Sequence, residues 1–178
     1  VWTPRNQAGT VQGPATATHP PDRVSRGGIL SADLPESSAI GMPHSLEAEK
    51  EILAAMLRTS FRTAASPGNL NNLYGFPLAL LNLPEDIEWM VAEMGMSETG
   101  ELGKISRLGR PDVVLLLNVL PVHLGSFGNL REVGEAKAEI VEGLQEGGLI
   151  VLNAGDEELL RIGELYEQRR PDAEIQWF

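Results

Sequence analysis

The sequence predicts an α/β fold, doubly wound around a mostly parallel sheet. Three short apolar runs, Trp89–Ala92, Val113–Leu117 and Leu149–Leu152, have the length and composition of strands buried on both faces. A segment with helical spacing follows each run, and this alternation is typical of βαβ units. Polar residues stand just past the end of each run. Since the carboxyl ends of parallel strands meet at one edge of a sheet, we expect a ligand site at that edge.

Composition restricts the kind of protein. The chain has 178 residues, enough for one domain with a sizeable core. It has no cysteine, which excludes disulfides and thiolate chemistry and fits a cytoplasmic location. No apolar stretch approaches the roughly 20 residues of a membrane span, and no signal peptide opens the chain, so we expect no membrane span. The net charge of −11 argues against a nucleic-acid partner.

A change in composition near residue 45 divides the chain. Residues 1–44 hold six of the twelve prolines, carry no net charge and lack apolar periodicity apart from Ala39–Gly41, a weak strand signal. Such a segment buries too little apolar surface to offset an ordering entropy of about 1–2 kcal/mol per residue. We therefore expect an irregular or disordered arm over 1–44, and a domain over residues 45–178, which carry the whole net charge.

Helices and strands alternate through this second part. Apolar spacing predicts helices over 46–57, 70–83, 101–108, 130–144 and 156–168. Ser45 is placed to cap the first helix, and Pro77 predicts a kink or a late start in the second. The three apolar runs lie between these helices, and Glu174–Phe178 is expected to form a final strand.

Three ionisable side chains suggest chemistry at the sheet edge. Lys137 follows Val133 by four positions and precedes Ile140 by three, so it lies on the helix face that packs against the sheet. It is either a snorkelling side chain or a desolvated neutral amine, which can react with carbon dioxide to form an anionic carbamate. Glu93 is a hard oxygen donor suited to Mg²⁺. His123 either completes that site or is a hydrogen-bonded structural residue.

An amide-rich turn, Gly68–Asn72, precedes the second predicted helix. Its three amide side chains belong to Asn69, Asn71 and Asn72. A turn followed by a helix cap requires only one of them. The other amides indicate recognition of a ligand by side chains or by exposed backbone N–H groups.

Six short motifs occur in order between Thr63 and Asp156. They are GNxNNxxGxP from Gly68, EMG from Glu93, RPD from Arg110, NVxxxHL from Asn118, AKxEI from Ala136 and LNAxD from Leu152. Together they cover over half of the chain and resemble the central ATP-binding domain of the Mur ligases, closest to the MurF branch of that family. The resemblance begins abruptly near Lys50 and does not extend into the arm.

The resemblance implies an ATP-dependent amide ligase of peptidoglycan synthesis. Such an enzyme adds D-alanyl-D-alanine to UDP-muramoyl-tripeptide through an acyl phosphate. Mg²⁺ would be bound by Glu93, His123 and a carbamylated Lys137, and the last two would be catalytic.

The same resemblance implies the binding residues. Asn153 would face adenine, and Asp156 of the same motif would also contribute to the nucleotide site. The amides of Asn69, Asn71 and Asn72 would lie near the nucleotide-peptide substrate or the phosphates.

The phosphate-binding loop of the family is degenerate in this sequence. In the family a Walker-type GxxGKTT precedes a helix like Lys50–Leu57, which places the P-loop lysine on Leu46 and the Mg²⁺-binding hydroxyl on Glu47. No backbone nest, lysine or hydroxyl remains to hold phosphates, and Glu47 would repel them. The strand that carries this loop is expected to be lost or reduced to Ala39–Gly41, which leaves an exposed sheet edge or a gap filled by arm residues.

We therefore expect a partial Mur ligase central domain over 45–178, a fragment that lacks the N- and C-terminal domains of the family and is inactive alone. One alternative is a non-catalytic module that binds nucleotide or substrate. Another is a related ligase of the folylpolyglutamate synthetase (FPGS) type, against which the GNxNN and EMG motifs argue.

Overall fold

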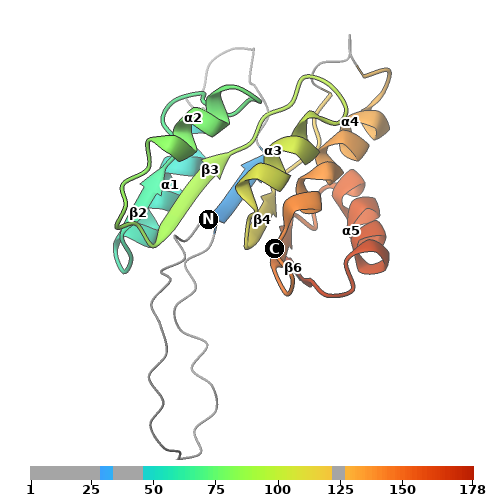
Figure 1. Ribbon diagram of the computed structural model, residues 1–178. Coiled ribbons are helices and arrows are strands. Elements are labelled where there is room, and N and C mark those ends of the chain that lie inside the picture. Colours follow the sequence, from blue (N-terminus) through green and yellow to red (C-terminus); the bar gives the residue numbers. More distant parts are fainter. Residues whose placement is uncertain (1–28, 34–45, 122–126) are drawn as a thin grey trace, which may run out of the picture.

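A six-stranded parallel sheet is the framework of this computed structural model, which describes residues 29–33, 46–121 and 127–178. The strands are β1 (Ile29–Asp33), β2 (Thr63–Ala65), β3 (Trp89–Glu93), β4 (Val113–Leu116), β5 (Leu149–Leu152) and β6 (Glu174–Trp177). Their order in the sheet is β2-β3-β1-β4-β5-β6, and all neighbours pair in parallel (Figure 1). The predicted α/β class is confirmed.

Helices connect the strands and cover the sheet. They are α1 (Leu46–Arg58), α2 (Gly75–Leu81), α3 (Glu101–Gly109), α4 (Leu130–Lys137), the 3₁₀ helix η1 (Ala138–Gly143) and α5 (Glu157–Arg169). Helix α1 packs against β2 and β3, whereas α3 packs on η1 and α4 packs on α5. Figure 1 shows α3, α4 and α5 gathered beside one another over the sheet.

Strand β1 lies in the segment for which the sequence predicted an irregular arm, and for residues 29–33 that prediction is wrong. The strand is central: Ala32 is level with Glu93 of β3 on one side and with Leu115 of β4 on the other. Without β1, the backbone groups of β3 and β4 that face each other would have no partner. Pairing with β3 and β4 therefore outweighs the weak strand preference of this segment. Of the two expected outcomes, an exposed sheet edge or a gap filled by arm residues, the structure has the second. The remainder of 1–44, with Ala39–Gly41, lies outside the described residues.

Helix α2 is shorter than its apolar spacing predicted. It begins at Gly75 rather than at residue 70, so the late start that Pro77 predicted is confirmed. The Asn72 side chain causes this, because its Oδ1 accepts the backbone N–H groups of Tyr74 at 3.0 Å and Gly75 at 2.9 Å. Residues 68–72 are thus held as a turn in front of the helix.

The helix predicted over 130–144 is α-helical only as far as Lys137 and continues as η1. Carbonyls of η1 accept bonds from side chains of α5 and its end. Tyr166 Oη donates to the Ala138 carbonyl at 3.0 Å, and Arg170 Nη1 donates to the Val141 carbonyl at 2.7 Å. These contacts come from residues 28 and 29 positions away, so local spacing could not predict the change of helix type.

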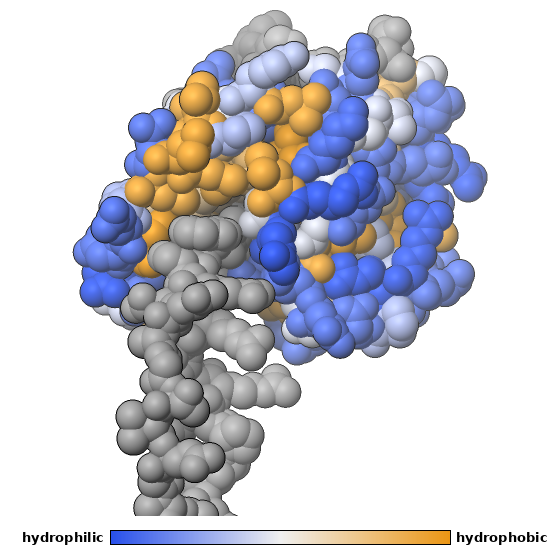
Figure 2. All heavy atoms as spheres, in the orientation of Figure 1, coloured by the Kyte–Doolittle hydropathy of each residue, from blue (hydrophilic) through white to orange (hydrophobic). Residues whose placement is uncertain are grey.

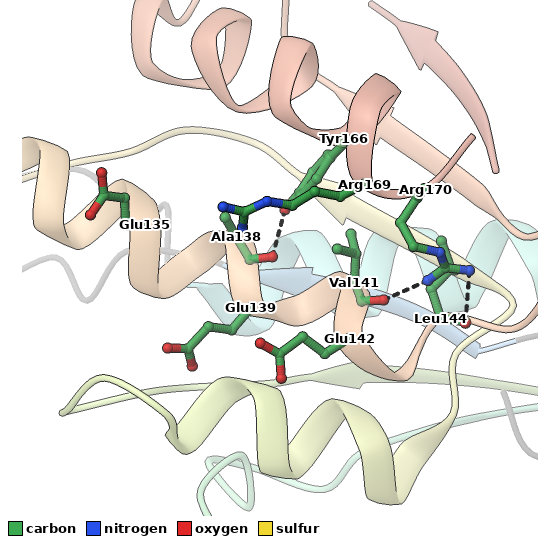
Figure 3. Close-up of a pocket in the computed structure, with 9 residues that line it drawn as sticks. All are labelled: Glu135, Ala138, Glu139, Val141, Glu142, Leu144, Tyr166, Arg169 and Arg170. Atoms are coloured by element: carbon green, nitrogen blue, oxygen red, sulfur yellow. Dashed lines mark hydrogen bonds between the residues drawn. The ribbon is translucent and has the colours of Figure 1, made fainter. Parts of the chain in front are cut away.

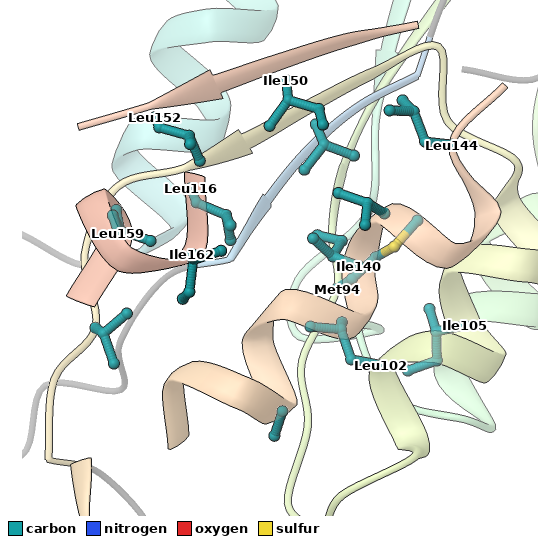
Figure 4. Packing of buried hydrophobic residues seen from close by; sticks show 14 of the residues in the cluster. Met94, Leu102, Ile105, Leu116, Ile140, Leu144, Ile150, Leu152, Leu159 and Ile162 are labelled. Atoms are coloured by element: carbon teal, nitrogen blue, oxygen red, sulfur yellow. The ribbon is translucent and has the colours of Figure 1, made fainter. Parts of the chain in front are cut away.

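The main core lies between the sheet and helices α3 to α5. Figure 4 shows Leu116 and Leu152 of the strands beside Leu159 and Ile162 of α5. Each such buried side chain contributes about 1.5–3 kcal/mol relative to an exposed one. Apolar side chains are also exposed on the α2 side of the molecule, while the α4 and α5 side is largely hydrophilic (Figure 2). No helix within the described ranges is long and apolar enough to cross a membrane.

Candidate functional site

The carboxyl edge of the sheet brings together the polar residues that follow the strands. Glu93 ends β3, whereas Asn118 and Asn153 follow the ends of β4 and β5. In the sheet, β3 and β5 are separated by β1 and β4. With neighbouring strands about 4.8 Å apart, Glu93 and Asn153 lie on the order of 14 Å apart along this edge. An extended ligand would span that distance, whereas a single ion would occupy one end of it.

Glu93 is held in a defined position at the end of β3. It is 5% exposed, and its Oε1 accepts a hydrogen bond from Asn71 Nδ2 at 2.8 Å. Its backbone N–H donates to Ser66 Oγ at 3.3 Å. The backbone N–H of Gly95 donates to the Asn71 carbonyl at 2.8 Å. The carboxylate predicted to bind Mg²⁺ and an amide predicted to lie near the substrate are thus direct partners.

The three asparagines of the turn differ in their environments. Asn71 contacts Glu93, and Asn72 forms the turn in front of α2. Asn69 is exposed, and its side chain makes no hydrogen bond in the part of the chain that the structure describes. One amide therefore positions a carboxylate, one supports the local fold, and one faces solvent.

Lys137 is buried at the end of α4, with 1% of its surface exposed. A snorkelling lysine would place its ammonium group in water, so that interpretation is wrong. His123 lies in 122–126, outside the described residues, and its place relative to Glu93 stays a prediction. Among the residues with described positions, no three His, Cys, Asp or Glu side chains form a group that could hold a metal ion.

Glu139 anchors the backbone two residues after Lys137. Its carboxylate accepts the N–H of Gly100 at 2.7 and 2.9 Å and that of Gly103 at 3.2 Å. A carboxylate is favoured there because the N-terminus of α3 carries partial positive charge. Ser106 Oγ of α3 also donates to the carbonyl of Ile140. These bonds lock η1 onto α3 and thereby set where α4, with Lys137, ends.

Asn153 and Asp156, the residues predicted to contact the nucleotide, connect two loops. Asn153 Nδ2 donates to the Leu117 carbonyl at 2.9 Å. Asp156 caps α5, since its Oδ1 accepts the N–H of Leu159 at 3.0 Å, and its Oδ2 accepts the N–H of Val119 at 2.7 Å. Both side chains therefore join the loop after β4 to the loop after β5. A ligand contact by either residue would be made by a group that is already fixed in place.

One acceptor beside these loops is unsatisfied. Asn118 Oδ1 is buried and has no hydrogen-bond partner among the residues that the structure describes. A buried polar atom without a partner costs about 1–3 kcal/mol, so it is favourable for a ligand to supply the donor.

Two polar residues that the sequence patterns did not indicate as buried, Lys50 and Ser66, lie in the interior. Ile52 and Met56, two of the apolar residues whose spacing predicts the helix over 46–57, are 60% and 65% exposed. The inward face instead follows positions 50, 53, 54 and 57: Lys50, 2% exposed, and Ala54 are buried, and Leu53 and Leu57 are half-buried. These positions have the i, i+3, i+4, i+7 spacing of one helix face. The sequence did not indicate this face as apolar because one of its four positions is a lysine.

A pocket of about 420 Å³ lies away from Glu93, between η1 and α5 (Figure 3). It is lined by Glu135, Ala138, Glu139, Val141, Glu142, Leu144, Tyr166, Arg169 and Arg170. Most charged groups around it are already paired: Glu139 with the start of α3, Glu142 with Arg107, and Arg170 with Asp172. Because most of its charged groups are paired within the protein, we do not assign this pocket as the candidate site.

Comparisons with known proteins agree with this geometry. A family model of the Mur ligase middle domain matches residues 49–171. The UDP-N-acetylmuramoyl-tripeptide--D-alanyl-D-alanine ligase of Bacillus subtilis (strain 168) is 41% identical over 112 residues, which are 63% of this chain and 24% of that ligase. The chain therefore spans about a quarter of the length of this relative.

Solved structures of MurF are also similar to this chain. MurF from Acinetobacter baumannii aligns with a TM-score of 0.70 and 27% identity, covering 84% of this chain and 30% of that one. MurF ligase from Thermotoga maritima, in complex with ADP, aligns with a TM-score of 0.67 and 26% identity over 86% of this chain and 33% of that one. L. casei FPGS in complex with AMPPCP covers 86% of this chain and 46% of its own, with a TM-score of 0.56 but 11% identity, and so shares the fold alone.

Proposed function

The chain belongs to the Mur ligase family through its middle domain, and we propose that it represents part of a ligase that adds D-alanyl-D-alanine to UDP-muramoyl-tripeptide. The observation that carries this proposal is the hydrogen bond between Asn71 and Glu93. It joins the GNxNN and EMG motifs, the pair by which the sequence resembles MurF rather than FPGS.

Glu93 is the residue that we assign to Mg²⁺. A carboxylate oxygen is a ligand that Mg²⁺ prefers, and this ion takes one or two carboxylates while water and phosphate supply the other positions. Asn71 orients the Glu93 carboxylate, as residues that hydrogen-bond to metal ligands commonly do. When bound, Mg²⁺ would neutralise and orient the phosphoryl group of ATP. His123 and Lys137 are the further ligands that we propose, the latter as its carbamate.

The nucleotide is proposed to lie along the carboxyl edge, from Glu93 toward the loops after β4 and β5. Asn153 and Asp156 hold these loops, and the unsatisfied Asn118 Oδ1 can accept a donor such as the amino group of adenine. The complex of the Thermotoga relative with ADP supports a nucleotide as the ligand class.

We propose no catalysis by this chain alone. The family places a lysine and a hydroxyl where this sequence has Leu46 and Glu47, and a carboxylate there repels phosphates. A second candidate function, a module that binds substrate or nucleotide without turnover, is favoured by this feature.

The two functions can be separated by measuring ligation and binding in parallel. The chain is mixed with Mg²⁺, ATP, UDP-muramoyl-tripeptide and D-alanyl-D-alanine, with the Bacillus subtilis ligase as positive control. We expect no product above the level without enzyme. Product formation would refute the inactivity of the chain, and binding of ATP measured by calorimetry would support the binding module.

The metal assignment is tested by Mn²⁺ binding, which is followed by electron paramagnetic resonance without any need for turnover. Glu93→Gln removes the charge but keeps the shape, and should weaken Mn²⁺ binding at least tenfold. Glu85→Gln, at an exposed loop position, is the matched control and should leave the affinity unchanged. Equal affinities of the two variants would exclude Glu93 as a ligand.

A further inference from the structure

A buried lysine on α1 is unexplained by the proposed reaction. The chain has three lysines, Lys50, Lys104 and Lys137, and Lys50 is buried on the inward face of α1. Removing an ammonium group from water is strongly unfavourable unless good partners replace the water. A leucine or methionine would pack at this position without that cost, so the contacts of the ammonium group should explain why a lysine stands there.

The partners of Lys50 are two backbone carbonyls of the turn that carries Asn71. Its Nζ donates to the carbonyl of Ser66 at 2.6 Å and to that of Gly68 at 3.1 Å. Hydrogen bonds from charged donors are stronger than those from neutral donors. One ammonium group therefore holds the chain on both sides of Pro67, from a different element of structure.

This turn has little other support from the sheet. Strand β2 has three residues, Thr63–Ala65, and among the described strands it lies at the edge of the sheet and pairs with β3 alone. The last backbone bond of that ladder runs from the Ser66 N–H to the Val91 carbonyl at 2.9 Å. Beyond Ser66 the chain leaves the sheet, at the point where Lys50 binds it.

The contacts continue from the turn to the proposed metal ligand. Ser66 Oγ accepts the backbone N–H of Glu93, and Asn71 donates to the Glu93 carboxylate. The Asn71 carbonyl accepts the N–H of Gly95 at 2.8 Å. Lys50 is thus linked to both the backbone and the carboxylate of Glu93 through the segment 66–71.

We propose that Lys50 is a positioning residue: it holds the segment 66–71 so that Asn71 orients the Glu93 carboxylate. It acts through the turn and not by contact with a substrate. The consequence for metal binding rests on the proposed function of Glu93, but the effect on the turn does not.

Native-state hydrogen exchange of the 178-residue chain tests the proposal. The probe is the Gly95 amide, which reports whether Asn71 is in place, and the reference is the Ile150 amide, which pairs within the sheet. Lys50→Met removes the donors and keeps an unbranched apolar side chain. Lys50→Arg retains a cationic donor, and Lys104→Met is the control at an exposed position.

Lys50→Met should raise the exchange rate of Gly95 at least tenfold without denaturant, through a local opening that depends little on denaturant. The rate at Ile150 should rise less, Lys50→Arg should restore at least part of the protection, and Lys104→Met should change neither rate. Should Lys50→Met fail to fold, Lys50→Gln replaces it, with an expected rise of at least threefold. Equal acceleration at Gly95 and Ile150 would mean that Lys50 only stabilises the whole domain, and would overturn the proposal.

Mn²⁺ affinity separates this inference from the proposed function. If Glu93 binds the metal, Lys50→Met should weaken Mn²⁺ binding at least fivefold, and Lys50→Arg should restore part of the affinity. If the unmodified chain binds no Mn²⁺, the metal assignment of Glu93 fails, while the exchange rates at Gly95 still decide the role of Lys50.

Discussion

Asn71 and Glu93 are 22 positions apart in the chain, and the Asn71 side chain donates a hydrogen bond of 2.8 Å to the Glu93 carboxylate. The bond joins the turn after β2 to the end of β3. Each residue lies in a short motif whose purpose is not evident from that motif alone. Together they form a fixed carboxylate at the carboxyl edge of the sheet, and the stability of this arrangement can be measured directly.

Asn71→Ala should lower the free energy of unfolding by about 1–3 kcal/mol, because it removes the hydrogen bond that Asn71 donates to a buried carboxylate. Urea denaturation gives this value. The control is Asn69→Ala in the same turn, where the side chain is exposed and the change should stay within about 0.5 kcal/mol. Similar losses for both variants would contradict a specific role for Asn71.

Asp156→Ala should destabilise the domain by about 1–3 kcal/mol, since it removes the cap of α5 together with the bond to the Val119 N–H. Glu164→Ala, at an exposed position within the same helix, should cost less than about 0.5 kcal/mol. Thermal or urea unfolding of the pair provides the measurement. If the two variants are equally stable, Asp156 does not join the two loops in solution.

Gly143→Ala should cost at least about 2 kcal/mol, because its Cβ would overlap the backbone carbonyl of Ser106 where η1 packs on α3. Backbone cannot move aside as a side chain does, so the two helices would have to separate. At Gly128 the nearest atom to a new Cβ is a Glu132 carboxylate oxygen at 3.3 Å, and Gly128→Ala should be nearly neutral. A fully stable Gly143→Ala variant would show that η1 and α3 are farther apart than described.

The ion pair of Arg170 with Asp172 predicts a pH dependence. Hydrogen bonds from Arg170 lower the pKa of Asp172 from 3.8 to about 2, and the same contact raises the pKa of Arg170. Because the pKa of Asp172 is lower in the folded state, its stabilisation is fully present above about pH 4 and is lost as the pH falls through about 2.

Asp172→Asn should therefore be less stable than the unmodified chain at neutral pH, and the difference should shrink between about pH 4 and pH 2. Urea denaturation of both chains over this range measures the difference, so that acid effects on other carboxylates cancel. A difference that stays constant down to about pH 2 would mean that the carboxylate does not titrate as the ion pair requires.

Much of the candidate site could be predicted from sequence because its residues follow strands that short apolar runs reveal. Glu93 and Asn153 were expected at the carboxyl edge, and they lie there. The partners of these residues were not predictable in the same way. Asn71 binds Glu93, and Asp156 binds the Val119 N–H, across 22 and 37 positions of sequence.

The sequence by itself determined the strands β3 to β6, the helices between them and the family of the domain, because periodicity and short motifs are local properties of the chain. Only the tertiary structure decided that Ile29–Asp33 is a central strand, that the helix after residue 137 becomes η1, and that Lys50 faces inward. Each of these depends on donors and acceptors supplied from distant positions. A backbone group left without a partner in the interior costs more than a weak local preference, and so distant partners determine the structure at these places.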